Sequence, residues 1–110
     1  MEFGLLLPNK GRVYGDVNLL VELAVSAEQA GWEGFFLWDH IGEDGDAPTM
    51  DPWICLAAIA SQTRSLRLGT MISPRSRRRP WKVAREIVTL DHLSHGQAVL
   101  GVGLGDLVNK

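Results

Sequence analysis

The chain reads Phe35-Phe36-Leu37-Trp38-Asp39-His40 in its first half, where four large apolar residues run directly into a carboxylate and an imidazole. The apolar run is too short for a free-standing helix and lacks helical spacing, so it predicts a strand buried on both faces. Asp39 and His40 then follow at the carboxyl end of this strand. In parallel α/β proteins the loops at this end converge on a cleft, which is where these folds perform chemistry.

Three other apolar runs have the same character and predict three more strands. They are Phe3–Leu7, Arg67–Ile72 and Ala98–Val102. Turn residues 8–11 end the first of these runs, and a basic loop from Ser73 to Pro80 follows the second. The four runs begin near residues 3, 35, 67 and 98, at intervals of 32, 32 and 31 residues.

A helical pattern separates each predicted strand from the next. Asp16 can cap the first helix and Gly31 can end it, Asp51-Pro52 starts the second, and the third runs from Pro80 to near Gly96. Their apolar stripes are expected to face the sheet. The stripes are Leu20, Leu23, Ala24, Ala27 and Ala30, then Trp53, Leu56, Ala57 and Ala60, and finally Val83, Ala84, Ile87 and Leu90.

Regular alternation of strand and helix indicates right-handed crossovers and a parallel sheet. Eight such units would need about 250 residues, the usual length of a (β/α)8 barrel. The 110 residues therefore predict an α/β fold of the TIM-barrel type, as one domain over residues 1–110. That domain is about half a barrel, with four parallel strands and three helices. A five-stranded doubly wound domain is the competing interpretation, but its fifth strand and two of its helices are missing.

Half a barrel would leave the outer strands with unpaired edges and the inward side chains without an opposite wall. We therefore expect a fragment that lacks its C-terminal half, a homo-oligomer that closes the barrel, or a half-barrel that docks onto a partner subunit without being an enzyme.

The composition excludes several functional classes. A net charge of −2 gives no general attraction to nucleic acid or membranes, and no apolar run approaches the roughly 20 residues that span a bilayer. The N-terminus lacks the pattern of a secretory signal, and Cys55 is the only cysteine. We expect a cytoplasmic protein that acts on a small molecule and binds neither nucleic acid nor membranes.

Asp39 and His40 could form a proton-transfer pair at the mouth of the barrel, or they could be an Asp that caps backbone amides and an exposed His. The glycine ladder of residues 101–105 is not a dinucleotide fingerprint, and tight packing at the strand end explains it better. Asp106 follows this ladder at a position equivalent to Asp39, so it could join the same pocket or cap a further helix.

Two other polar groups have weaker claims to function. The basic cluster Arg75, Arg77, Arg78 and Arg79 could attract an anion, but a solvated loop that pairs with nearby carboxylates is favoured. His92 and His95 are expected at the opposite end of the barrel from the strand C-termini, and no carboxylate or cysteine completes a metal site with them.

Four stretches together carry a resemblance that no single one of them would carry. They are Phe3–Pro8, residues 27–40, residues 67–74 with 79–86, and residues 89–96 running into the glycine ladder. In these stretches the chain resembles the N-terminal half of the bacterial luciferase-like family, flavin- or deazaflavin-dependent oxidoreductases built on a TIM barrel. The resemblance implies F420 or FMN at the C-terminal mouth, with hydride transfer or activation of O2 as the chemistry.

The resemblance also implies roles for individual residues. Asp39-His40 resembles the pair beside the ring in F420-dependent members, where the histidine accepts a substrate proton as hydride leaves for the cofactor. The segment Thr70–Ser73 resembles one that forms a bulge behind the ring, often with a non-proline cis peptide. Asp106 stands where F420-dependent sugar dehydrogenases carry an acidic residue, but it is one methylene shorter than the expected glutamate.

The predicted site follows from these comparisons of residues. Its catalytic residues are His40, Asp39 and Asp106, its cofactor-binding residues are Asp39, Thr70, Met71, Ile72, Gly105 and Asn109, and no metal is expected. Asp39-His40 and Asp106 favour F420 over FMN, although the choice between them stays open at this point.

Overall fold

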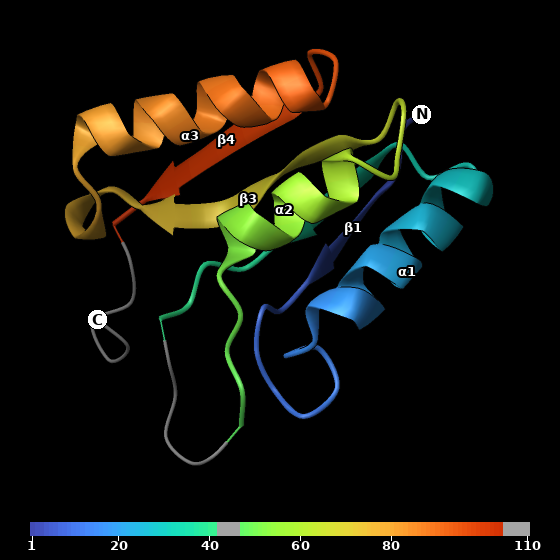
Figure 1. Cartoon of the computed structure of the whole chain (residues 1–110), viewed down its shortest axis with the longest axis horizontal. Helices are drawn as coiled ribbons and strands as arrows, with labels where there is room; N and C mark the ends of the chain where they lie inside the picture. The colour runs from blue at the N-terminus through green and yellow to red at the C-terminus, as the bar shows by residue number, and fades with distance from the viewer. Residues whose placement is uncertain (42–46, 105–110) are drawn as a thin grey trace.

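The computed structural model describes residues 1–41 and 47–104, apart from the side chain of Arg75. Within these residues, strands and helices alternate along the chain (Figure 1). They are β1 (Gly4–Leu7), α1 (Val17–Gln29), β2 (Gly34–Leu37), α2 (Pro52–Ala60), β3 (Arg67–Pro74), the 3-10 helix η1 (Arg75–Arg77), α3 (Pro80–Leu93) and β4 (Ala98–Gly103). The strands form one parallel sheet in the order β1-β2-β3-β4. The predicted half-barrel of four parallel strands and three α-helices is therefore confirmed.

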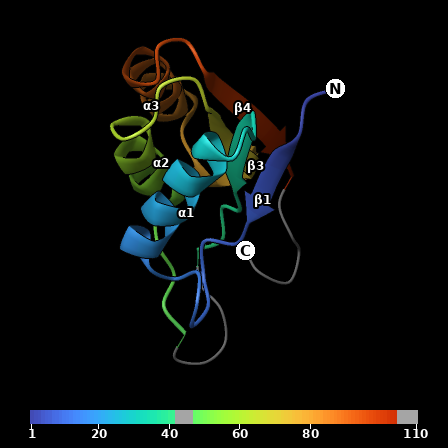
Figure 2. The ribbon, with the colours of Figure 1, turned by 90° about the vertical axis from the view of Figure 1, so that its right-hand side faces the viewer.

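The three α-helices all cover the same face of the sheet (Figure 2). This is the expected result of right-handed crossovers between neighbouring parallel strands. Helices outside and strands inside are also the arrangement of a barrel wall. The opposite face of the sheet is the concave face, and no helix in the described part of the chain covers it.

The hydrophobic core lies between the sheet and its helices. Side chains alternate along a strand, so Phe35, Leu37 and Leu68 all point to the helix layer, where each is completely buried. Their partners in the same cluster come mainly from α1 and α2: Leu20, Ala24, Ala27, Trp53, Cys55, Leu56, Ile59 and Ala60.

The concave face is also apolar, but it is open to solvent. The strand register places Leu6 opposite Phe36, Phe36 opposite Gly69, and Gly69 opposite Val99, so these four residues share that face. Leu6 and Val99 are both exposed. Exposed apolar side chains on a contiguous face are typical of a surface that another element covers.

The helix boundaries follow the predicted signals. The carboxylate of Asp16 accepts hydrogen bonds from the backbone N–H groups at the start of α1, and that of Asp51 accepts one from Ile54 N at the start of α2. Gly31 takes a φ of +94° just after α1, a conformation that favours glycine. In the part of the chain that the structure describes, no helix is both long and apolar enough to cross a membrane.

Three local predictions are wrong. The predicted loop from Ser73 to Pro80 starts too early, because β3 resumes its pairing with β4 after an irregularity and continues to Pro74. Ala30 and Ala84 are exposed rather than part of the core. Ala30 is the C-cap of α1, and α3 buries only Leu90 because it lies over the edge of the sheet that β4 forms.

Cys55 belongs to the core of α2. Burial, together with the negative charge of Asp51, raises the pKa of its thiol to about 11. The thiol therefore stays protonated and packs as a small apolar group.

Glu28 of α1 anchors the turn that leads into β3. Its carboxylate accepts hydrogen bonds from the backbone N–H groups of Arg64, Ser65 and Leu66, at 2.8 to 3.2 Å. Burial acts to raise the pKa of this carboxyl, but the backbone donors outweigh burial and lower the pKa below its ordinary value of 4.5. A lowered pKa in the folded state means that the ionised carboxylate stabilises the fold.

We expect Glu28→Gln to be less stable than the wild type at pH 7, with a difference that shrinks as the pH falls. The stabilisation is complete above the unfolded-state pKa and is lost as the pH falls through the lower, folded-state pKa. Urea denaturation at several pH values between 3 and 7 measures this difference. Glu22→Gln, at an exposed position on the same helix, is the control. A stability difference that does not change with pH would contradict this account of Glu28.

Candidate functional site

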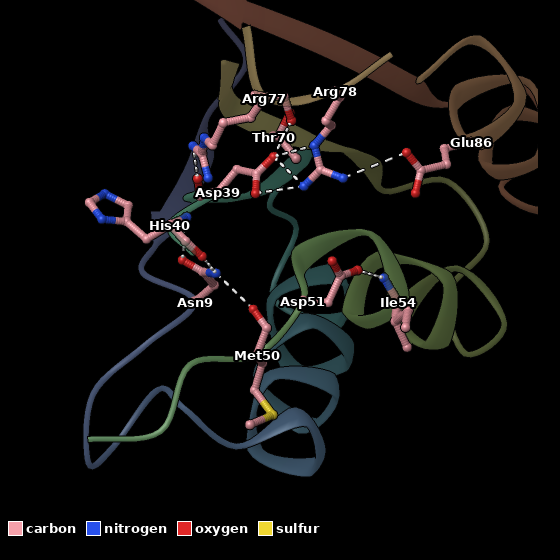
Figure 3. A network of polar contacts seen from close by, with 11 residues as sticks. Asn9, Asp39, His40, Met50, Asp51, Ile54, Thr70, Arg77, Arg78 and Glu86 are labelled. Carbon is pink, nitrogen blue, oxygen red and sulfur yellow. Dashed lines mark hydrogen bonds and ion pairs between the residues drawn. The ribbon is translucent and has the colours of Figure 1, made fainter. Parts of the chain in front are cut away.

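Asp39 lies directly beyond β2 and its side chain points into the protein. The residue is only 3% exposed. Its carboxylate accepts a hydrogen bond of 2.6 Å from Ser73 Oγ, at the end of β3, and hydrogen bonds of 2.8 to 3.2 Å from the guanidinium of Arg78 (Figure 3). Its backbone carbonyl accepts a hydrogen bond from the guanidinium of Arg77. The acid at the tip of β2 therefore ties β2 to the segment that follows β3.

Arg78 is the ionic partner of Asp39. Its side chain is 19% exposed, and it also lies 3.7 Å from the carboxylate of Glu86 on α3. The prediction that the basic cluster pairs with carboxylates is confirmed for Arg78. The prediction of a solvated loop is wrong for this residue, because burial of Asp39 requires a buried counter-charge.

His40 points the other way. Successive side chains of an extended chain alternate, and Figure 3 shows the His40 ring directed away from the Asp39 carboxylate. The ring packs against Trp38 instead, with 5.2 Å between ring centroids and an interplanar angle of 32°. The structure therefore brings Asp39 and His40 to the same strand end without placing the carboxylate against the imidazole.

Asn9 contacts His40, although the sequence patterns did not single it out. Its side chain accepts a hydrogen bond from His40 N and donates to His40 O and Met50 O, at 2.7 to 3.2 Å. The residue is completely buried. The turn signal of Pro8-Asn9 concealed this role, because Asn is common in exposed turns.

The end of β3 carries an irregularity opposite β4. The register between these strands shifts between Thr70 and Ser73, and the peptide bond between Met71 and Ile72 is cis. A bulge with a non-proline cis peptide at this segment was implied by the resemblance and is confirmed. Met71 and Ile72 are 48% and 47% exposed, so both present apolar surface to solvent. Thr70 is buried instead, with its hydroxyl 2.9 Å from Ser73 Oγ.

Two glycines allow β3 and β4 to approach closely at this bulge. A Cβ on Gly69 would lie 2.0 Å from the Val99 carbonyl oxygen, and one on Gly101 would lie 2.4 Å from that of Thr70. Tight packing at the strand end is therefore confirmed for the described part of the glycine ladder. Gly105, Asp106 and Asn109 lie outside the described residues.

A pocket of about 270 Å³ opens beyond the carboxyl end of β2. Asp39, His40, Met50, Asp51 and Arg78 are among the residues that line it. His92 and His95 are remote from it, because they lie where α3 ends and the chain turns into the amino end of β4. Their predicted separation from the strand C-termini is confirmed.

Comparison of the sequence with known proteins shows the family to which this chain belongs. The family described as luciferase-like monooxygenase matches residues 1–109. This chain belongs to the luciferase-like monooxygenase family. An F420-dependent glucose-6-phosphate dehydrogenase from Nakamurella multipartita is a luciferase-like relative, 36% identical over 96 residues. That match covers 83% of this chain and 28% of the relative.

Solved structures extend the comparison to the whole described fold. The F420-dependent tetrahydromethanopterin reductase of Methanopyrus kandleri superposes with a TM-score of 0.84 at 28% identity, over 98% of this chain and 28% of that one. The oxygenating constituent of 3,6-diketocamphane monooxygenase from Pseudomonas putida, in complex with FMN, gives a TM-score of 0.81 at 25% identity. This match covers 96% of the luciferase-like chain and 30% of the monooxygenase. The luciferase-like chain thus spans about 28% of the length of the curated relatives it matches.

Proposed function

We propose that this chain forms part of the active site of an oxidoreductase that uses F420 or FMN, with the cofactor ring against Met71 and Ile72. The observation that carries the proposal is the bulge of β3, where two large apolar side chains stand about half exposed at the carboxyl end of the sheet. His40 follows the neighbouring strand at the same end. The named activities of the F420-dependent and FMN-binding relatives support this choice of cofactor.

The residues present fit a flat heteroaromatic ring. Such rings bind to apolar surfaces that carry a few polar groups at their edge. Met71 and Ile72 supply the apolar surface, with Val102 exposed on β4 nearby. His40 supplies an imidazole that can exchange a proton. Asp39 and Thr70 would support this surface from behind, since both contact Ser73 at the base of the bulge.

When bound, F420 or FMN would supply hydride transfer, and FMN could also react with O2. The chain's own contribution would be to handle the proton. Oxidation of a substrate hydroxyl releases one proton, and the imidazole of His40 is the group that would accept it. Asp39 would serve as a fixed charge that holds Arg78 and the bulge in place, rather than as the base.

Three residues of the predicted site lie outside the described residues, and their roles are proposed from the sequence. Asp106 would be a second acid or base, while Gly105 and Asn109 would contact the cofactor. F420 is the favoured cofactor, because the relatives whose sequence matches extend over most of this chain are F420-dependent dehydrogenases. The substrate would be a small molecule with an oxidisable group.

Cofactor titration of the 110-residue chain tests this proposal. We expect F420 or FMN to give a saturable change in fluorescence, and Ile72→Ser to weaken binding about tenfold, because about 1.4 kcal/mol of apolar contact would be lost. Ile54→Ser is the matched control, because Ile54 is exposed on α2 away from the bulge. No saturable change with either cofactor at high micromolar concentration would contradict the proposal, as would equal effects of the two variants.

The open concave face favours a second candidate, a non-enzymatic half-barrel that pairs with another copy of itself. Leu6 and Val99 are exposed on this face, and β1 and β4 form the edges of the sheet in the described chain. Two copies that met through these faces would bury both apolar surfaces. Sedimentation velocity would then show a concentration-dependent dimer, whereas a folded monomer at all concentrations would contradict this candidate.

A further inference from the structure

We propose that Asn9 is the positioning residue of His40, holding its main chain through a side-chain amide that replaces the missing end of β1. The role of His40 in proton transfer rests on the proposed function, but its attachment to Asn9 does not. The hydrogen-bond pattern of the parallel ladder between β1 and β2 supports this role of Asn9.

The backbone ladder between these strands ends one step before His40. Leu7 pairs with Leu37, and the carbonyl of Leu7 accepts the N–H of Trp38 at 3.0 Å. Residues of a parallel pair bond to the partners before and after the one opposite. By this pattern Asn9 would stand opposite Asp39, and its backbone carbonyl would accept the N–H of His40.

At this step the side chain of Asn9 takes the place of its backbone carbonyl. The backbone carbonyl of Asn9 accepts the N–H of Met50 instead, at 2.8 Å. The side-chain carbonyl of Asn9 takes the N–H of His40 at 3.2 Å, and its NH2 group donates to the carbonyl of His40 at 3.0 Å. The side chain therefore performs for His40 what a backbone peptide performs elsewhere in the sheet.

This arrangement requires an amide. An Asn side chain offers an acceptor oxygen and an NH2 group with two donors. Here the oxygen accepts from His40 N, and the NH2 group donates to His40 O and to Met50 O. The side chain is completely buried, so lost contacts could not be replaced by bulk water. An Asp of the same shape would keep the acceptor and place a carboxylate against two carbonyl oxygens.

The clamp sets where the imidazole can go. Both peptide groups of His40 are held, so the point from which its side chain extends is fixed. Trp38 then limits rotation of the ring by packing 5.2 Å away, centroid to centroid. The third hydrogen bond, to Met50, joins the same clamp to the segment that leads into α2. Asn9 thus connects the ends of β1 and β2 to the start of α2 around one histidine.

The test compares His40 in Asn9→Asp and in the wild-type chain. Histidines labelled with carbon-13 at Cε1 give one signal each from His40, His92 and His95, and His40→Gln assigns the first. At a single pH, we expect Asn9→Asp to shift or broaden the His40 signal beyond its linewidth and to leave the other two unchanged. Asn18→Asp, an exposed change from Asn to Asp on α1, should move none of them.

A purely structural role is distinguished by a variant that only destabilises the fold. Thr63 is buried at the far end of α2, where its hydroxyl donates to Ile59 O at 3.0 Å. Thr63→Ala should lower the melting temperature without moving the His40 signal. If Asn9→Asp does not fold, Asn9→Ser gives the same comparison with a smaller polar side chain. An unchanged His40 signal in the folded Asn9 variant would overturn the proposal.

Adding F420 or FMN to the same samples separates this proposal from the proposed function. We expect the cofactor to shift the His40 signal in the wild type, and to shift it less in Asn9→Asp. If neither cofactor moves any signal of the wild type, the proposed function fails. The comparison without cofactor still decides whether Asn9 positions His40.

Discussion

Replacing Arg78 with Met should lower the free energy of unfolding by about 3 kcal/mol, because it leaves the buried Asp39 carboxylate without its counter-charge. Arg78 makes the charged hydrogen bonds to this carboxylate, and Asp39 is almost completely buried. Ser73 would remain as a donor, but a neutral hydroxyl cannot compensate the charge. A domain of this size has a total stability of only about 5–15 kcal/mol, so the loss should be evident in a urea denaturation curve.

Two further variants establish the cause of this loss. Arg79→Met is the control, because Arg79 is exposed and its guanidinium lies over the Trp81 ring, 5.4 Å from the ring centroid. That change should cost below about 1 kcal/mol. Asp39→Asn in the Arg78→Met background should recover part of the loss, because no buried charge then remains. If Arg78→Met lowered the free energy of unfolding as little as Arg79→Met does, the ion pair would not stabilise this end of the sheet.

Gly69→Ala should destabilise the chain by about 3 kcal/mol or more, since the new methyl group meets backbone rather than a movable side chain. Its Cβ would lie 2.0 Å from the Val99 carbonyl oxygen, and 3.2 Å from the Val99 Cβ. Because Gly69 pairs with Val99, the strands β3 and β4 would have to separate next to the bulge. Hydrogen exchange of the β3 and β4 amides, together with denaturation, would measure this separation.

Gly103→Ala provides the matched comparison on β4. The three atoms nearest to a Cβ at that position would all belong to the Ile72 side chain, the nearest at 3.1 Å, and this side chain can move. We expect a cost of about 1 kcal/mol or less. Equal losses for the two glycines would contradict the conclusion that close backbone approach requires Gly69.

The fold was predictable because its signals are local and repeat along the chain. Apolar runs such as Phe35–Trp38 mark strands, and caps such as Asp16 and Asp51-Pro52 mark helix starts. The regular spacing between runs then implied crossovers of one hand. The irregularity after Thr70 was implied by the resemblance and not by the residue types, because it depends on pairing with β4, which residue types alone do not reveal.

The candidate site was predictable in position but not in its contacts. Alternation along the strand was sufficient to infer that Asp39 and His40 face opposite ways. Their adjacency left a proton-transfer pair open, and the resemblance to the luciferase-like family then implied it. The carboxylate of Asp39 pairs with Arg78, which is 39 residues away in the sequence. The backbone of His40 is bound by Asn9, which is 31 residues away in the sequence. Contacts of such separation leave no periodic signal in a sequence.

We propose that the bulge of β3 and the end of β2 form one side of an F420 or FMN site. The chain spans about 28% of the length of its curated relatives, so these two elements would be one wall of such a site. On the described part of the chain this wall would consist of the exposed apolar pair Met71 and Ile72 together with His40, whose main chain Asn9 holds by hydrogen bonds.

The most direct measurement is an NMR search for nuclear Overhauser effects between the cofactor ring protons and the methyl groups of Met71 and Ile72. The chain would carry labelled methyl groups and be saturated with F420 or FMN. We expect cross-peaks to both residues and none to Ile54, which is exposed on α2. Saturable binding with cross-peaks only to residues of the helix layer, or no binding of either cofactor, would contradict the proposal.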